Sequence, residues 1–147
     1  NHFPGLSELT RKDRLIANIV QMQERYGRRE FDIIPDSYIL PDEFADFYAH
    51  FHANGQADNT WIIKPTNSSQ GKGIYIVSFC PVTCVVDQLS EVPIDEPAII
   101  SRYIKNPLLI NGLKFDLRLY VLVTSVHPLV VYLHDEGLAR FALEIYD

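Results

Sequence analysis

The stretch Gly71-Lys72-Gly73 has the residue types of a loop that cradles phosphate. Glycines let backbone N–H groups approach anionic oxygens closely, and the lysine adds positive charge. A Walker A loop is excluded, because Thr66 stands where that motif needs its first glycine and Gly73 follows Lys72 in place of Ser or Thr. A Rossmann turn is excluded because its third glycine is missing and residues 74–79 favour a strand. For this motif alone, an ordinary hairpin turn remains the alternative.

Basic residues within apolar segments form a second group of candidates. Lys64 interrupts an apolar strand pattern, and a lysine there either meets an anion or extends its ammonium group to water. Arg140 also lies among apolar neighbours, and Arg102 and Lys105 flank residues 103–104. Each of these residues, taken singly, fits an ordinary surface position equally well.

Three charged residues, Lys114, Asp116 and Arg118, recur at a spacing of two. That spacing places them on one face of a strand whose opposite face is apolar. An exposed sheet face would show the same pattern. Together with the two lysines and the glycine loop on a separate hairpin, however, the pattern suits a polyphosphate clamped between two sheets.

Two helices are expected to support these segments. Apolar residues repeat with helical spacing over 10–26, where Thr10 can cap the helix and Gly27 can end it. A second helix is expected from Pro41, with acidic residues in its first turn. Its aromatic stripe predicts core packing and consists of Phe44, Phe47, Tyr48 and Phe51.

The remaining periodic segments favour strands, predicted at 31–34, 61–65, 74–77, 98–104, 115–125, 129–134 and 138–143. Turns at His127-Pro128 and Asp135-Glu136-Gly137 make the tail an antiparallel meander. Because hairpins dominate over strand-helix-strand units, the fold class is predicted as α+β and not as a doubly wound parallel sheet.

Composition excludes several classes of protein. With 47% hydrophobic residues in 147, the chain can bury the core of one ordinary domain, and no apolar run is long enough to span a bilayer. The net charge of −6 disfavours nucleic acid as a partner, because such binding depends on neutralising phosphates. Neither nucleic acid nor membrane is therefore expected as a partner.

Cys80 and Cys84 are too few for a disulfide framework and lack the companions of a zinc site, so we expect them to be reduced and structural, in a reducing, cytosolic compartment. Both ends of the chain look cut, with no initiator Met or signal segment at Asn1, and the chain is expected to be a piece of a longer protein.

The sequence resembles the tubulin-tyrosine-ligase-like amino-acid ligases of the ATP-grasp superfamily, over nearly its whole length. Within this family, the sequence is most similar to the tubulin polyglutamylase branch at Glu8 to Leu15, Asn106 to Ile110 and Thr124-Ser125. The motifs that carry the resemblance are Asn1-His2-Phe3-Pro4-Gly5, Leu9-Thr10-Arg11-Lys12-Asp13, Trp61-Ile62-Ile63-Lys64-Pro65, Ser69-Gln70-Gly71-Lys72-Gly73-Ile74, Ser101-Arg102-Tyr103-Ile104, Lys114-Phe115-Asp116-Leu117-Arg118-Leu119-Tyr120-Val121 and Glu136-Gly137-Leu138-Ala139-Arg140-Phe141-Ala142.

The resemblance implies an α+β ATP-grasp fold with antiparallel sheets in two lobes and the nucleotide between them. It divides the chain into the end of an N-terminal domain (1–29), the central lobe (30–104) and the start of a truncated C-terminal lobe (105–147).

The implied activity is ATP-dependent addition of L-glutamate to glutamate side chains in the acidic tails of tubulin, through an acyl phosphate. The implied location is the cytoplasmic microtubule cytoskeleton, including the cilium or basal body. Two alternatives stay open: a glycine-adding ligase, and a non-catalytic scaffold that binds nucleotide or microtubules. The fragment alone is expected to be inactive. ATP and Mg²⁺ are the implied cofactors, with the Mg²⁺ ligands outside this chain.

The resemblance also assigns roles to residues. Lys64 and Lys72 bind phosphate, Gln70 and Gly71 share the loop of Lys72, and Lys12 lies near the phosphates. The backbone of Ser101, Arg102, Tyr103 and Ile104 reads the adenine edge.

The remaining assignments fall on the C-terminal part of the chain. Lys114 and Asp116 contact the nucleotide. Arg140 holds the carboxylate of the incoming amino acid, and Arg118 is a candidate for the acyl phosphate or the acceptor tail. A planar guanidinium suits a carboxylate better than an ammonium group does.

Overall fold

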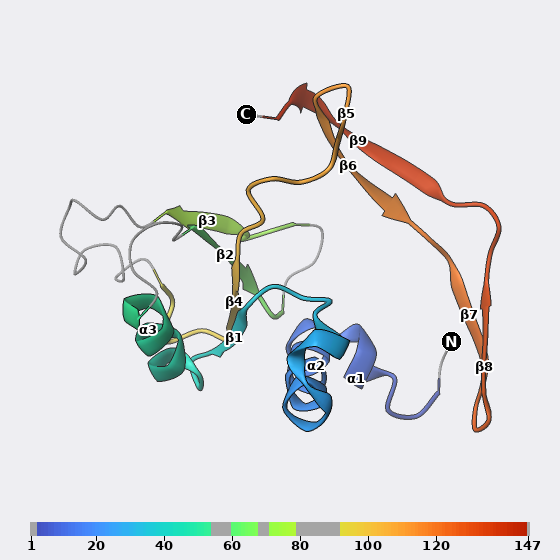
Figure 1. Ribbon diagram of the computed structural model, residues 1–147, viewed down its shortest axis with the longest axis horizontal. Helices are drawn as coiled ribbons and strands as arrows, with labels where there is room; N and C mark the ends of the chain where they lie inside the picture. The colour runs from blue at the N-terminus through green and yellow to red at the C-terminus, as the bar shows by residue number, and fades with distance from the viewer. Residues whose placement is uncertain (1–2, 54–59, 68–70, 79–91, 147) are drawn as a thin grey trace. The chain divides into compact units, whose positions relative to one another are not determined.

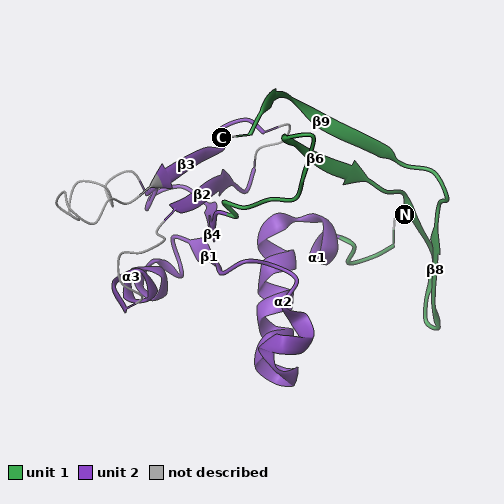
Figure 2. Ribbon diagram, turned by 45° about the horizontal axis from the view of Figure 1, so that its top comes forward, with its two compact units in different colours: residues 1–6, 104–147 green, residues 7–103 purple. Residues whose placement is uncertain are grey.

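The computed structural model describes residues 3–53, 60–67, 71–78 and 92–146 (Figure 1). The chain divides into two compact units, one of Ser7–Tyr103 and one of Asn1–Leu6 with Ile104–Asp147 (Figure 2). Three residues with a predicted role lie outside the described residues. They are Cys80 and Cys84, expected to be reduced and structural, and the loop residue Gln70. No helix in the described ranges has the length and apolar character needed to cross a membrane.

The unit of residues 7–103 is built on a four-stranded antiparallel sheet in the order β1-β4-β2-β3. Its strands are β1 (Ser37–Leu40), β2 (Thr60–Pro65), β3 (Tyr75–Ser78) and β4 (Ala98–Arg102). Helix α3 (Phe44–Ala53) packs against one face of this sheet. The most deeply buried side chains are Trp61, Phe47, Leu40, Ile63, Ile99, Ile100 and Val77.

The aromatic stripe of α3 supplies part of this core, as predicted. Phe47 and Phe51 are buried, and Phe44 packs on the cluster from a partly buried position. Phe47 meets the indole of Trp61 edge-on, with 5.1 Å between ring centroids. Tyr48 departs from the prediction, because it is 45% exposed.

The first predicted helix is interrupted. Residues Ser7–Thr10 form α1 and Lys12–Tyr26 form α2, so Thr10 ends one helix and Arg11, which makes no capping hydrogen bond through its side chain, precedes the other. Gly27, with φ of 97°, ends α2 as predicted.

The predicted strand at 31–34 is wrong. Residues Arg28–Phe31 form the short 3-10 helix η1, and the strand β1 begins only at Ser37. The side-chain amide of Gln23 on α2 donates to the carbonyl of Phe31 and holds this segment to the helix. Pro35 has no N–H for a sheet hydrogen bond, so pairing with β4 starts after it.

The unit that contains Ile104–Asp147 holds β5 (Leu109–Ile110), β6 (Leu113–Arg118), β7 (Val121–Val126), β8 (Leu129–Leu133) and β9 (Leu138–Ile145). Their sheet orders are β5-β6-β9 and β7-β8, all antiparallel. The antiparallel tail is therefore confirmed, but the meander is wrong, because β9 pairs with β6 and not with β8.

The single long strand predicted at 115–125 is also wrong. It breaks at Leu119 and Tyr120, where the chain changes from pairing with β9 to pairing with β8. Gly137 sits at this break, and a Cβ there would lie 2.7 Å from the carbonyl oxygen of Arg118. The close approach of the two backbones explains why glycine occupies this turn.

Candidate functional site

Lys64 lies on β2, on the face of the sheet opposite the α3 core. Trp61 and Ile63 point into that core, and strand alternation places Lys64 on the other side. The lysine is half-buried, and burial followed by the nearby charge of Lys12 lowers its pKa below the ordinary value. Lys64 makes no ion pair with any described residue.

Lys12, the first residue of α2, approaches Lys64 from a different element. Its Nζ atom donates to the carbonyl oxygen of Pro65 over 3.5 Å. The fold thus brings two cations, far apart in the sequence, to the same end of β2. Because the two ammonium groups repel one another in a partly buried environment, an anion bound between them would be stabilised.

The glycine loop returns to the same point. β2 and β3 pair as antiparallel strands from Thr60↔Ser78 to Ile63↔Tyr75, as predicted for the two strands that the glycine loop joins. Gly71 and Gly73 have φ of 76° and 70°, a region that favours glycine. A Cβ at Gly73 would come within 3.1 Å of the Pro65 ring, so the loop closes against the residue that also accepts from Lys12. Lys72 is exposed.

The end of β4 is held through its backbone and side chains. The N–H of Arg102 donates to Asp36 and that of Tyr103 to Thr60, over 2.8 and 2.9 Å. The hydroxyl of buried Ser101 lies 2.9 Å from that of Ser37. Because the Ser37 hydroxyl donates its one proton to Pro35, Ser101 is the donor in this pair.

These contacts decide which groups on this segment remain for a ligand. The side chain of Ser101 is committed to the sheet, and so are the N–H groups of Arg102 and Tyr103. In the described part of the chain, no hydrogen bond is made by the N–H of Ile104.

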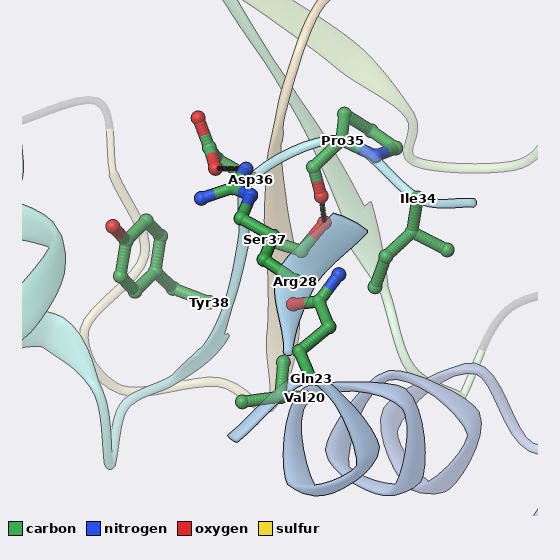
Figure 3. A pocket seen from close by; sticks show the side chains of 8 residues that line it. All are labelled: Val20, Gln23, Arg28, Ile34, Pro35, Asp36, Ser37 and Tyr38. Atoms are coloured by element: carbon green, nitrogen blue, oxygen red, sulfur yellow. Dashed lines mark hydrogen bonds and ion pairs between the residues drawn. The ribbon is translucent and has the colours of Figure 1, made fainter. Parts of the chain in front are cut away.

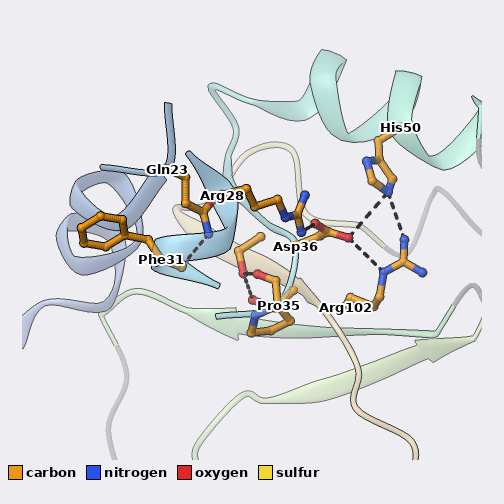
Figure 4. Close-up of polar contacts among 9 residues, drawn as sticks. Gln23, Arg28, Phe31, Pro35, Asp36, His50 and Arg102 are labelled. Carbon is orange, nitrogen blue, oxygen red and sulfur yellow. Dashed lines mark hydrogen bonds and ion pairs between the residues drawn. The ribbon is translucent and has the colours of Figure 1, made fainter. Parts of the chain in front are cut away.

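A polar cluster that the sequence pattern did not indicate surrounds Asp36 (Figure 4). Its carboxylate accepts hydrogen bonds from Arg28 and, over 3.2 Å, from Nε of Arg102. Burial alone would raise the pKa of Asp36, but the hydrogen bond from Arg28 and the charges of Arg28 and Arg102 outweigh it, and the pKa falls below its ordinary value.

Asp36 also lines a pocket of about 180 Å³ beside α2 (Figure 3). Gln23, Arg28 and Tyr38 contribute to its wall. An aspartate after a proline is an ordinary turn signal, so no local pattern could have marked Asp36, whose partner Arg102 is 66 residues away.

In the other unit, the structure places Asp116 and Arg140 directly opposite one another on β6 and β9. The Nε and Nη2 atoms of Arg140 donate to the same carboxylate oxygen over 2.9 and 2.5 Å. Both side chains are more than half exposed, so the ion pair contributes little to stability and an incoming anion can compete for the arginine.

Lys114 lines the same shallow pocket of about 420 Å³ as Asp116 and Arg140. Its ammonium group lies 5.3 Å from the ring centroid of Tyr146. Arg118, opposite Leu138 at the end of β6, is exposed and does not line this pocket. Over the described ranges, no three His, Cys, Asp or Glu side chains gather as a metal site would require.

Comparison with known proteins gives matches over the whole chain. The model of the tubulin-tyrosine ligase family matches residues 1–147. Human tubulin polyglutamylase TTLL5 is 47% identical over 147 residues, covering 100% of this chain and 10% of the relative. Tubulin polyglutamylase ttll-5 of Caenorhabditis elegans is 41% identical over 157 residues, covering 100% and 20%. Mouse tubulin monoglutamylase TTLL4 is 42% identical over 142 residues, covering 97% and 11%.

A solved structure matches as well. The C-terminal domain from K. lactis Pby1, described as an ATP-grasp enzyme interacting with the mRNA decapping enzyme Dcp2, superposes with a TM-score of 0.61 at 24% identity. The match covers 96% of this chain and 41% of that one. The chain spans about a tenth of the first curated relatives that it matches.

Proposed function

The chain belongs to the tubulin-tyrosine ligase family and has the predicted α+β ATP-grasp fold, and from this premise we propose that it is part of an ATP-dependent tubulin polyglutamylase. The proposed reaction adds L-glutamate to glutamate side chains in the acidic tails of tubulin. Relatives named tubulin polyglutamylase, identical at 47% and 41% of aligned positions, support this substrate.

The observation that carries the proposal is the convergence of Lys12 and Lys64 beside the glycine loop. The charge on Lys64 is unfavourable for the folded state, since burial and the nearby charge of Lys12 both lower its pKa. A triphosphate would relieve both effects. The residues therefore fit an ATP phosphate chain, with Lys72 supplied by the loop.

The base would meet the segment that ends β4. Since the N–H groups of Arg102 and Tyr103 are committed within the sheet, we assign the adenine-facing donor to the N–H of Ile104. Lys114 and Asp116 are also proposed to contact the nucleotide. Gln70 and Gly71 complete the phosphate loop in this proposal, and Mg²⁺ accompanies the ATP to neutralise phosphate charge, with no residue named here assigned to it.

The chemistry requires an activated carboxylate. An acceptor carboxylate becomes electrophilic when its oxygen attacks the γ-phosphorus of ATP, which releases ADP and leaves an acyl phosphate. The amino group of free glutamate then attacks the carbonyl carbon, phosphate leaves, and an isopeptide bond remains. Fixed cations stabilise the charge that develops on the phosphoryl oxygens.

The donor amino acid would be oriented by Arg140, whose guanidinium already binds one carboxylate, that of Asp116. A free amino acid presents the same group, and a planar fork matches it. Arg118, exposed at the end of the strand that carries Asp116, is proposed for the acyl phosphate or the acceptor tail. The protein would act at the cytoplasmic microtubule cytoskeleton, which includes the cilium and basal body.

An assay on the full-length protein tests this function. Microtubules, with or without their acidic tails removed, are incubated with ATP and radiolabelled glutamate or glycine. The proposal expects tail-dependent and ATP-dependent incorporation of glutamate. Incorporation of glycine alone would make the protein a glycine-adding ligase. ATP binding without incorporation of either amino acid would make it a scaffold.

A further inference from the structure

Asp36 joins three elements of the unit of residues 7–103. Its carboxylate accepts hydrogen bonds from the side chains of Arg28 on η1 and Arg102 on β4. Its backbone carbonyl oxygen also accepts a hydrogen bond from the N–H of Arg102, over 2.8 Å. His50 on α3 completes the cluster, with Nε2 3.0 Å from Nη2 of Arg102 (Figure 4). A guanidinium has only donors, so this histidine nitrogen accepts.

The register of the sheet shows on which side this cluster lies. Trp61 is opposite Arg102 and Lys64 is opposite Ile99. Paired residues of neighbouring strands share a face, and residues three apart on one strand point to opposite faces. The side chain of Arg102 therefore lies on the α3 face, with its guanidinium 5.3 Å from the Trp61 ring, and Lys64 lies on the other.

Arg102 consequently differs from the other basic residues of the candidate site. Its charge is not presented on the face that carries Lys64, so it does not add to the phosphate-binding cations there. What it fixes is the path of its own backbone: both its N–H and its side chain are attached to Asp36, and Tyr103 directly follows. This is the segment proposed above to face adenine.

We propose that Asp36 is a positioning residue for nucleotide selection: by holding Arg102 at two points, it fixes the backbone from which the adenine-facing segment continues, and so favours adenine over guanine. The inference rests on the proposed function for its ligand, ATP. It requires that loss of the Asp36 carboxylate affect recognition of the base more than binding of the phosphates, because Lys12 and Lys64 stay in place.

The test measures binding of ATP and of GTP to the full-length protein by isothermal titration calorimetry. We expect the wild-type protein to bind ATP more tightly than GTP. For Asp36→Asn we expect the Kd for ATP to rise about five- to tenfold while that for GTP changes less than about twofold, as for loss of one charged hydrogen-bonding partner. Asp36→Glu should restore most of the preference for ATP. Asp95→Asn, which removes an exposed aspartate of the same unit, is the matched control and should leave it unchanged.

If Asp36 had only a structural role, the calorimetric titrations would give a different result. Partial unfolding lowers the binding stoichiometry and affects both nucleotides alike, leaving the ratio of their Kd values unchanged, and that result would overturn the proposal. If Asp36→Asn does not fold, Arg102→Lys provides the test. This variant keeps the positive charge but loses the planar guanidinium that contacts Asp36. An unchanged ratio of the two Kd values in Arg102→Lys would also overturn the proposal.

The wild-type protein separates this inference from the function itself. Equal binding of ATP and GTP, or no binding of either, would overturn the positioning role. Selective ATP binding without transfer of glutamate would refute the ligase activity, while the variants would still decide the role of Asp36.

Discussion

Lys64 is half-buried beside a second cation, and both effects lower its pKa, so its charge is unfavourable for the folded state. Lys64→Met keeps most of the side-chain volume and removes the charge. We expect a melting temperature equal to or above that of wild type, and ATP binding weakened about tenfold or more. Thermal melts and calorimetric ATP titrations measure the two effects.

The sign of the pH dependence follows from the lowered pKa of Lys64. The cost of its charge is fully present below the folded-state pKa and disappears as the pH rises toward the ordinary lysine value. Any gain in stability from Lys64→Met should therefore shrink at alkaline pH. Arg29→Met, which removes an exposed cation of the same unit, is the control. Unchanged ATP affinity in Lys64→Met would remove this residue from the phosphate site.

Asp36 gives the opposite behaviour in acid. Because its folded-state pKa is lowered, its contribution to stability is complete above the ordinary aspartate pKa of about 4 and is lost as the pH falls through the folded-state value. We expect Asp36→Asn to melt below wild type at neutral pH, with the gap closing under acidic conditions. A gap that stays constant down to the lowest pH at which the protein folds would contradict the ion pairs assigned to Asp36.

Arg140 is expected to serve the donor amino acid. Arg140→Ala should raise the KM for glutamate about tenfold or more while the Kd for ATP stays within about twofold, since only a carboxylate contact is lost. Arg140→Lys keeps the positive charge but lacks the planar guanidinium, so its KM for glutamate should lie between those of wild type and Arg140→Ala. Steady-state kinetics with ATP in excess, together with ATP titrations, separate these effects. Loss of ATP binding would reassign the residue to the nucleotide.

Individual candidates differ in how far the sequence could identify them. A lysine inside an apolar strand and a Gly-Lys-Gly turn are local signals, so Lys64 and the loop could be proposed directly. The meeting of Lys12 with Pro65, 53 residues away, depends on the packing of α2 against the sheet, which no local pattern contains. Asp36 could not be found at all, because its role comes from two arginines on separate elements.

At the scale of elements, Gly137, which directly precedes β9, should be essential for the pairing of β6 with β9. Gly137→Ala would place a Cβ 2.7 Å from the carbonyl oxygen of Arg118, which forces the backbones apart. We expect a loss of about 1–3 kcal/mol, as for overpacking elsewhere, seen as a lower melting temperature. Ala139→Ser on the same strand should have little effect, and an unchanged melt for Gly137→Ala would disprove the close approach.

The strand predictions were wrong where tertiary contacts decide which segments pair. Periodicity identified the residues of β6 and β7 as strand formers, but it carries no information about which strand each one pairs with, so a single strand was expected where two exist. The segment after α2 is apolar enough for a strand, yet the Gln23 amide holds Phe31 and the pairing moves beyond Pro35. Tertiary contacts overrode local preference in both places.

At the scale of the whole molecule, the α+β class could be inferred from the dominance of hairpins, and the family from ordered motifs along the chain. Both are confirmed by the family match over residues 1–147 and by the ATP-grasp neighbour. The division into domains at 29 and 104 stays a prediction, as do the roles of the site residues. The physical arrangement on which the proposed function depends is the convergence of two lysines and a glycine loop at Pro65.

The most direct measurement is mass spectrometry of tubulin tails after reaction with the full-length protein, ATP and glutamate, with ADP quantified in parallel. The account predicts tail masses that increase by whole glutamyl residues, one ADP for each residue added, and a reduced increase with Lys64→Met. Glutamyl addition that proceeds without ATP, or that survives undiminished in Lys64→Met, would contradict it.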